Sequence, residues 1–180
     1  MKHMPLLCMV LFTLTTAAQT APLKLNQIQI IASHNSYKKR PSEKELKFLM
    51  KVKKQLGEEN NPIALDYGHL PFDSQFSYFN VRGLEIDINN DPKGGLFYKR
   101  KINAFVPGLK QKSGIEALKK PGLKVLHIKD VDYETHYYTF KESLQAIKKW
   151  SDEHPKHMPL FINIEIKNFA PADEIGVLRF

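Results

Sequence analysis

The sequence contains very little cysteine. Its 180 residues include one, Cys8, and this residue lies in an N-terminal apolar run from Leu6 to Leu14 that is too short to span a membrane. A chain that loses this segment would have no disulfide, so its stability would have to come from its core. The histidines at the ends of the predicted strands are not closely spaced with another histidine or a cysteine, and this disfavours a zinc site there.

The N-terminal segment has the layout of a secretory signal peptide. Lys2 precedes the apolar run, and small residues follow it, with a cleavage site at Thr16-Ala17-Ala18. We therefore predict a signal peptide over residues 1–18 and a mature chain that begins at Gln19, with Ala21 as the alternative. One domain is expected over residues 19–180, in a secreted or periplasmic protein.

The chain is strongly basic. Its formal net charge is +8, and lysines are concentrated between Lys38 and Lys54. Nucleic acid and an anionic membrane surface are the two partners that such a charge suggests. No aromatic residues alternate with these lysines to stack on bases, so nucleic acid is disfavoured. The pattern also fits a solvated amphipathic helix over 42–58, with Ser42 and Glu45 as its capping box.

Four short apolar runs predict β-strands, because each is rich in Val, Ile and Leu and has the length of a strand. They cover residues 28–33, 81–88, 123–128 and 159–166. A helix is predicted before the fourth run, where Phe140, Leu144, Ile147 and Trp150 recur at helical spacing. A short helix is predicted at 113–120. Alternation of strands and helices predicts an α/β fold with a parallel sheet.

Polar residues stand at or just beyond the carboxyl end of every predicted strand. They are His34 and Asn35, Glu85 and Asp87, His127, and Glu165. In a parallel α/β barrel these ends form one rim, which is where active sites are built. We therefore expect the six side chains to share one site.

The residue types in this set indicate a metal-assisted reaction. Three carboxylates and an amide oxygen make a hard, all-oxygen pocket that suits Ca²⁺, with Mg²⁺ as the alternative. Two histidines can exchange protons near neutral pH. A metal and two histidines together suit attack on a phosphodiester, in which negative charge develops and protons are transferred.

Several sequence blocks also resemble a known family. The blocks "SHNSY", "ALDYGHLPFDSQF", "VRGLEIDINNDPKGG", "LKVLHIKDVD" and "PLFINIEIK" are similar, in that order, to the calcium-dependent branch of the phosphatidylinositol-specific phospholipase C superfamily. The resemblance runs from about residue 26 to 168. It implies a TIM-barrel phosphodiesterase that cleaves inositol phospholipids or related phosphodiesters at a membrane surface.

The resemblance also implies roles for the six residues. Asn35, Glu85, Asp87 and Glu165 would bind calcium, while His34 and His127 would flank the scissile phosphate. His127 would be the acid for the leaving group. An inositol hydroxyl would attack the neighbouring phosphorus, so that a cyclic phosphate forms and diacylglycerol leaves.

Other polar residues near these positions receive weaker assignments. Lys167 lies two residues after Glu165, so it could face the same site and hold a phosphate; a solvent-exposed lysine is the alternative. Asp130 and Asp132 are candidates to support His127. His69 and Arg82 are interpreted as structural residues.

A complete barrel of this kind needs eight strand–helix units and about 250 residues. Four units are recognisable in this sequence, which predicts the N-terminal half of a barrel. A second hypothesis is therefore a truncated, catalytically inactive relative that binds lipid or phosphate through its basic face. The sequence leaves the exact substrate and the oligomeric state open.

Overall fold

The computed structural model describes residues 23–56 and 61–167 of the chain. The predicted signal peptide, including Cys8, lies outside these ranges. Within them, no helix combines the length and the apolar character needed to cross a membrane.

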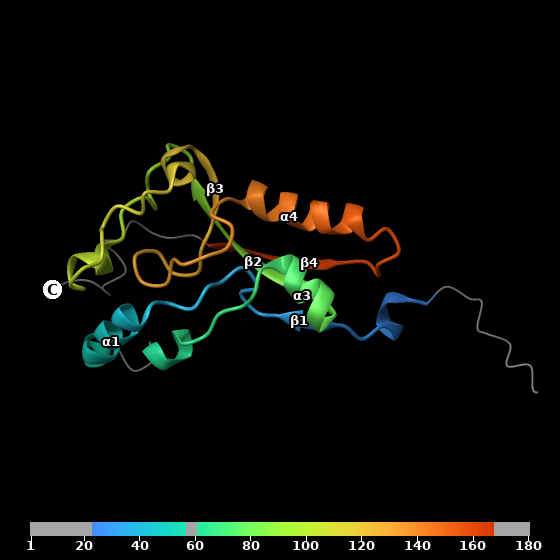
Figure 1. Ribbon diagram of the computed structural model, residues 1–180, viewed down its shortest axis with the longest axis horizontal. Helices are drawn as coiled ribbons and strands as arrows, with labels where there is room; N and C mark the ends of the chain where they lie inside the picture. The colour runs from blue at the N-terminus through green and yellow to red at the C-terminus, as the bar shows by residue number, and fades with distance from the viewer. Residues whose placement is uncertain (1–22, 57–60, 168–180) are drawn as a thin grey trace, which may run out of the picture.

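The four strands form one mixed sheet around a long central strand, β2. Their bounds are β1 Ile31–Ser33, β2 Val81–Asp91, β3 Gly122–Val125 and β4 Phe161–Lys167. Strands β1 and β4 pair with β2 in parallel, on its two sides. Strand β3 pairs antiparallel with the last residues of β2, Ile88 to Asp91. The sheet runs through the centre of the molecule, and the residues that follow β1 lead to α1 at one end (Figure 1).

The α/β class is therefore confirmed, but the prediction of four consecutive parallel strands is wrong for the third. A parallel connection needs a crossover that carries the chain back along the sheet, usually a helix. Between β2 and β3 the chain forms only two short 3₁₀ turns, η3 Lys101–Ala104 and η4 Glu116–Lys119. The chain consequently returns antiparallel, and the described residues form a mixed sheet rather than half of a parallel barrel.

Two predicted helices are present, and each begins at a capping box. Helix α1, Glu43–Lys51, begins after Ser42, which exchanges hydrogen bonds with Glu45. It is interrupted at Val52 and continues as α2, Lys53–Leu56. Helix α4, Phe140–Glu153, begins after Thr139, which is paired in the same way with Glu142. The helix predicted at 113–120 is the short 3₁₀ turn η4. Besides η3, three elements were not predicted: α3 Phe72–Phe79, η1 Leu25–Gln27 and η2 Pro62–Leu65.

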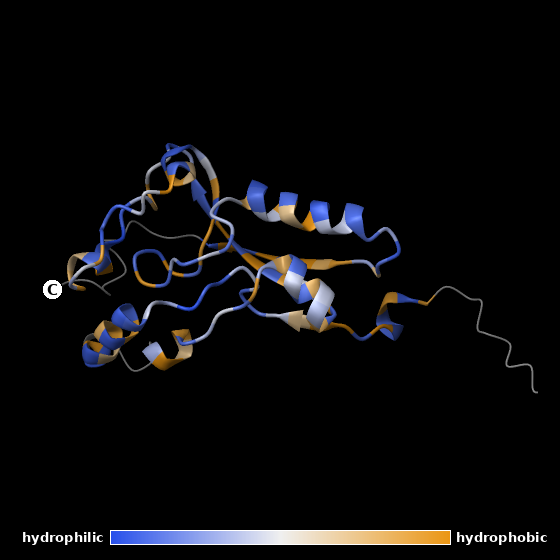
Figure 2. Ribbon diagram, in the orientation of Figure 1, coloured by the Kyte–Doolittle hydropathy of each residue, from blue (hydrophilic) through white to orange (hydrophobic). Residues whose placement is uncertain are grey.

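The main core lies between β2 and the two helices α3 and α4. Leu84, Ile86 and Ile88 alternate along β2, so they point to the same face of the sheet. They are buried in one cluster with aromatic side chains of the helices, including Phe76 and Trp150. Figure 2 shows the hydrophobic strands beside helix α4, whose surface is mostly hydrophilic. The opposite face of β2 is therefore left to Glu85, Asp87 and Asn89.

Candidate functional site

Three carboxylates converge on the face of the sheet opposite the core. The parallel register of β2 and β4 places Asp87 directly beside Glu165, and Glu85 precedes Asp87 by two residues on the same face. One carboxylate oxygen from each of the three lies within 4.8 Å of the other two. Because oxygen atoms at such separations can share one cation, the cluster has the composition of a Ca²⁺ site.

Asp87 is the buried member of this cluster. Its side chain is fully enclosed, and neither carboxylate oxygen accepts a hydrogen bond of good geometry from the described residues. Burial raises the pKa of Asp87, although the nearby Lys167 ammonium opposes this shift. A buried carboxylate with unused lone pairs is costly unless a cation neutralises it, so this side chain fits a metal ligand.

Lys167 supplies the positive charge at the cluster. Its Nζ lies 2.6 Å from Glu165 Oε1 and 3.2 Å from Asp87 Oδ2. Burial disfavours the charged form, but these two carboxylates outweigh it and raise the pKa of Lys167. One positive charge against three negative charges leaves the cluster anionic, so it would still attract a divalent cation.

The turn after β1 is attached to β2 by its backbone. Ser36 donates its N–H to the Glu85 carbonyl at 3.0 Å, and the Ser36 hydroxyl accepts the Glu85 N–H at 2.9 Å. This attachment holds His34 and Asn35 beside the carboxylates. His34 is exposed, and its Nε2 lies 3.3 Å from Glu85 Oε1, while His69 binds the His34 carbonyl at 2.8 Å.

Asn35 is buried and adopts a left-handed backbone with φ of 50°. Its Nδ2 donates to the Tyr67 hydroxyl at 2.8 Å, and its Oδ1 accepts from the Tyr37 hydroxyl at 3.1 Å. Burial and the neighbouring Asp87 carboxylate raise the pKa of Tyr37, so Tyr37 links Asn35 to the cluster. A carbonyl oxygen has two lone pairs, and the second one of Asn35 Oδ1 is available to a cation.

His127 lies two residues beyond β3, and its ion-pair partner is Asp132 rather than the three carboxylates. The distance from His127 Nδ1 to Asp132 Oδ2 is 2.7 Å, and the Asp132 side chain is fully buried. The antiparallel course of β3 brings this segment back to β2, where Asn89 donates to the Leu126 carbonyl at 2.9 Å. His127 therefore reaches the neighbourhood of the site from an antiparallel strand.

Asp132 also contacts a buried lysine, Lys38. The Lys38 ammonium lies 3.4 Å from Asp132 Oδ1 and donates to the carbonyls of Leu65 and Tyr67 at 2.9 and 2.6 Å. Burial lowers the pKa of Lys38. This lysine joins the turn after β1 to the loop of His127, so the two histidine-bearing segments are fixed relative to each other.

Sequence reasoning missed Ser36, Tyr37, Lys38 and Tyr67, all of which position the site. The first three lie in the block that follows His34 and Asn35, but nothing in the sequence distinguishes the buried Lys38 from its exposed neighbours. Of the two aspartates considered as supports for His127, Asp132 contacts it, whereas Asp130 accepts the backbone N–H of Lys101.

Comparison with known families identifies the chain. Residues 23–178 match the family model for Ca²⁺-dependent phosphoinositide phospholipase C. The chain belongs to this family. The match supports the predicted relationship, the calcium dependence and a phosphoinositide-type lipid substrate at the level of the family. Searches of curated proteins and of solved structures found no match.

Proposed function

We propose that this phospholipase C family member is a secreted, Ca²⁺-dependent phosphodiesterase that cleaves inositol phospholipids or related phosphodiesters at a membrane surface. The observation that carries the proposal is the convergence of Glu85, Asp87 and Glu165 within 4.8 Å beside His34. The N-terminal apolar segment supports export, and the basic net charge of +8 supports contact with anionic lipid.

In this proposal the three carboxylates and Asn35 would hold the calcium ion. A bound calcium ion would neutralise negative charge on the phosphate and lower the pKa of a neighbouring substrate hydroxyl. The Asp87 oxygens, which accept no hydrogen bond of good geometry from the described residues, and the second lone pair of Asn35 Oδ1 make this donor set suitable.

The two histidines would then act on opposite parts of the substrate. Asp132 holds His127 by Nδ1, so Nε2 remains to donate a proton to the leaving oxygen when the ring is an imidazolium. His34, exposed next to Glu85, would face the phosphate. Lys167 would exchange its contact with the carboxylates for one with a phosphate oxygen.

Calcium binding tests the metal site without reference to turnover. Calcium added to the full chain should raise the melting temperature, because a ligand that binds only the folded state stabilises it. Asp87→Asn should remove most of this shift. Asp152→Asn, which changes an exposed carboxylate on α4, should retain it. An unchanged melting curve of the parent chain at saturating calcium would overturn the metal assignment.

Turnover on phosphatidylinositol vesicles tests the chemistry. Release of diacylglycerol should require calcium, and His34→Ala and His127→Ala should each lower kcat by about 100-fold or more. Both variants should unfold as cooperatively as the parent. No calcium-dependent release by the parent chain would contradict the proposed activity, and near-normal turnover in either variant would contradict the role given to that histidine.

A further inference from the structure

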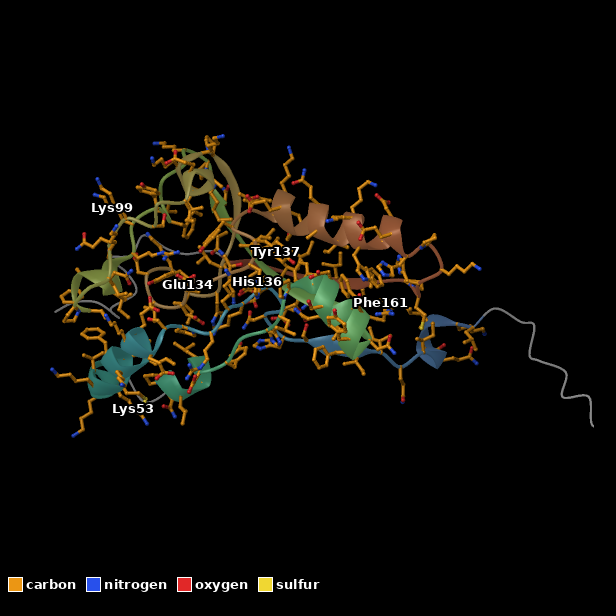
Figure 3. All side chains as sticks on the ribbon, in the orientation of Figure 1. Lys53, Lys99, Glu134, His136, Tyr137 and Phe161 are labelled. Carbon is orange, nitrogen blue, oxygen red and sulfur yellow. The ribbon has the colours of Figure 1, made fainter. Side chains whose placement is uncertain are left out.

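A second polar pocket lies away from the three carboxylates, between the segment after β1 and the loops at 100–113 and 133–134. Its volume is about 350 Å³, and its lining contains five cationic side chains and two acidic ones. The cationic residues are Lys39, Arg40, Arg100, Lys110 and Lys112. Figure 3 labels two residues that locate the pocket. Glu134 lines it, and Lys99 precedes Arg100; both lie toward the end of the molecule that carries α1.

The two acidic side chains of the pocket are already engaged by protein groups. Glu45 is buried, accepts the Ser42 N–H at 2.8 Å and is hydrogen-bonded by the Tyr133 hydroxyl. Glu134 is paired with Arg100, with 2.9 Å between Oε1 and Nη1. Neither carboxylate therefore competes strongly for a further cation, and the pocket keeps an excess of positive charge.

The three lysines that line the pocket have no ion-pair partner among the described residues. Lys39, Lys110 and Lys112 are exposed and make no contact with a carboxylate in residues 23–56 or 61–167. Arg40, in contrast, is paired with Glu43 and Asp66. Concave surfaces lined by charge of one sign concentrate ions of the opposite sign, so three unpaired ammonium groups around one hollow favour an anion.

Arg100 adds a fixed positive charge to the wall of the pocket. Its guanidinium carbon lies 3.9 Å from the centre of the Tyr133 ring, and its Nη1 and Nη2 donate to Glu134 at 2.9 Å and to the Tyr138 hydroxyl at 3.3 Å. Because these contacts hold the guanidinium in place, its charge adds to the field of the three lysines at the pocket.

The lining is also held in place by the backbone. Lys99 and Lys112 form an antiparallel bridge, and Arg100 donates its N–H to the Gln111 carbonyl at 2.8 Å. The Asn103 side chain donates to the Lys110 carbonyl at 2.9 Å. These contacts attach the segment that carries Lys110 and Lys112 to the segment that carries Arg100.

We propose that this pocket is an accessory binding site for a phosphate-bearing anion of the size of a lipid headgroup. It does not share a lining residue with the carboxylate cluster, and it does not depend on the proposed phosphodiesterase activity. The phosphate could belong to an anionic lipid in the membrane or to a soluble phosphate ester, since both present the same oxygens to the lysines.

Direct binding to the full chain, in the absence of calcium, tests the site. Inorganic phosphate and glycerophosphoinositol are the soluble probes, measured by calorimetry; vesicles of phosphatidylcholine with and without phosphatidic acid are the lipid probes, measured by sedimentation. Lys110→Gln/Lys112→Gln should weaken binding about tenfold or more. Lys141→Gln/Lys149→Gln, which removes the same charge from exposed positions on α4, should change it less than twofold.

The outcomes separate the two sources of phosphate. Binding of the soluble probes identifies a site for free phosphate esters, and binding to vesicles alone identifies a lipid headgroup site. The proposal is overturned if no probe binds, or if the α4 control weakens binding as much as the pocket variant, which would indicate general attraction to a basic surface.

Discussion

At the scale of single residues, Lys167 would compete with a calcium ion for the same oxygens in the proposed site. The ammonium contacts both Glu165 and Asp87, so a cation that binds these carboxylates must displace it. Lys167→Met should therefore tighten calcium binding, by about tenfold if one screened charge at short range is removed. Calorimetric titration of the variant and of Lys149→Met, an exposed lysine on α4, measures the effect. Equal or weaker affinity in Lys167→Met would exclude this competition.

His136 is a second residue with a specific consequence, in this case for pH. Its Nε2 lies 2.8 Å from the His69 carbonyl and donates to it, and burial lowers its pKa from the ordinary value of 6.5. As the pH falls, the imidazole of His136 is protonated in the unfolded chain at a higher pH than in the folded chain. The free energy of unfolding should therefore decrease as the pH drops through 6.5 toward the lower pKa of the folded chain.

His136→Gln keeps a donor to the carbonyl but does not titrate. The loss of unfolding free energy between about pH 7.5 and about pH 5.5 should be smaller in this variant than in the parent chain, as measured by urea denaturation. Every other histidine is present in both proteins, so the difference isolates His136. An identical loss in the two proteins would contradict the assignment.

At the scale of elements, the contact between β1 and β2 depends on Gly83. A Cβ at this position would lie 2.6 Å from the Cβ of Ala32 on the neighbouring strand. Gly83→Ala should therefore destabilise the fold by about 1–3 kcal/mol through overpacking. Ala32→Gly should restore part of this loss in the double variant, although it is unfavourable by itself. A double-mutant cycle in urea measures the coupling, and strict additivity would show that the two strands do not meet at this point.

Some of these helices and strands could be predicted from the sequence, and others could not. The capping box at Ser42 located α1, and the helical spacing of apolar residues from Phe140 to Trp150 located α4, because both signals depend only on neighbours in sequence. The apolar run at 123–128 located β3 but not its direction, because direction depends on the connection before it. Only the structure shows that the residues between β2 and β3 contain no helix long enough for a parallel return.

In the site, too, the residues that depend on local sequence signals could be predicted, and those that depend on distant segments could not. Glu85, Asp87 and Glu165 could be assigned together because side-chain alternation and strand register determine a common face. The supporting groups could not, because they meet across long separations in sequence. Lys38, Tyr67 and Asp132 come from three loops, and no local pattern indicates that a lysine will be buried between them.

At the scale of the whole molecule, strand β4 presents apolar side chains to solvent. Ile162, Ile164 and Ile166 are 37%, 44% and 71% exposed, and β2 is the only strand in the described ranges that pairs with β4. An apolar strand at the edge of a sheet favours association and binding of hydrophobic dyes.

Replacement of these side chains should reduce that tendency without harming the fold. Ile164→Thr/Ile166→Thr should lower dye fluorescence and light scattering at high protein concentration, with little change in melting temperature. Ile63→Thr, which alters an isoleucine that is 64% exposed in η2, is the matched control and should leave both signals unchanged. Equal dye binding in the β4 variant and the parent would locate the apolar surface elsewhere.

The left-handed backbone of Asn35 restricts which amino acids the protein can use there. An asparagine or aspartate tolerates a φ of 50° far better than a bulky or β-branched residue does. In the proposed calcium site, residue 35 would also have to supply a carbonyl or carboxylate oxygen. Glycine permits this backbone conformation but has no side-chain oxygen, and glutamate has the oxygen but tolerates a positive φ poorly. Asparagine and aspartate satisfy both conditions, so the backbone and the metal together would restrict residue 35 to these two amino acids.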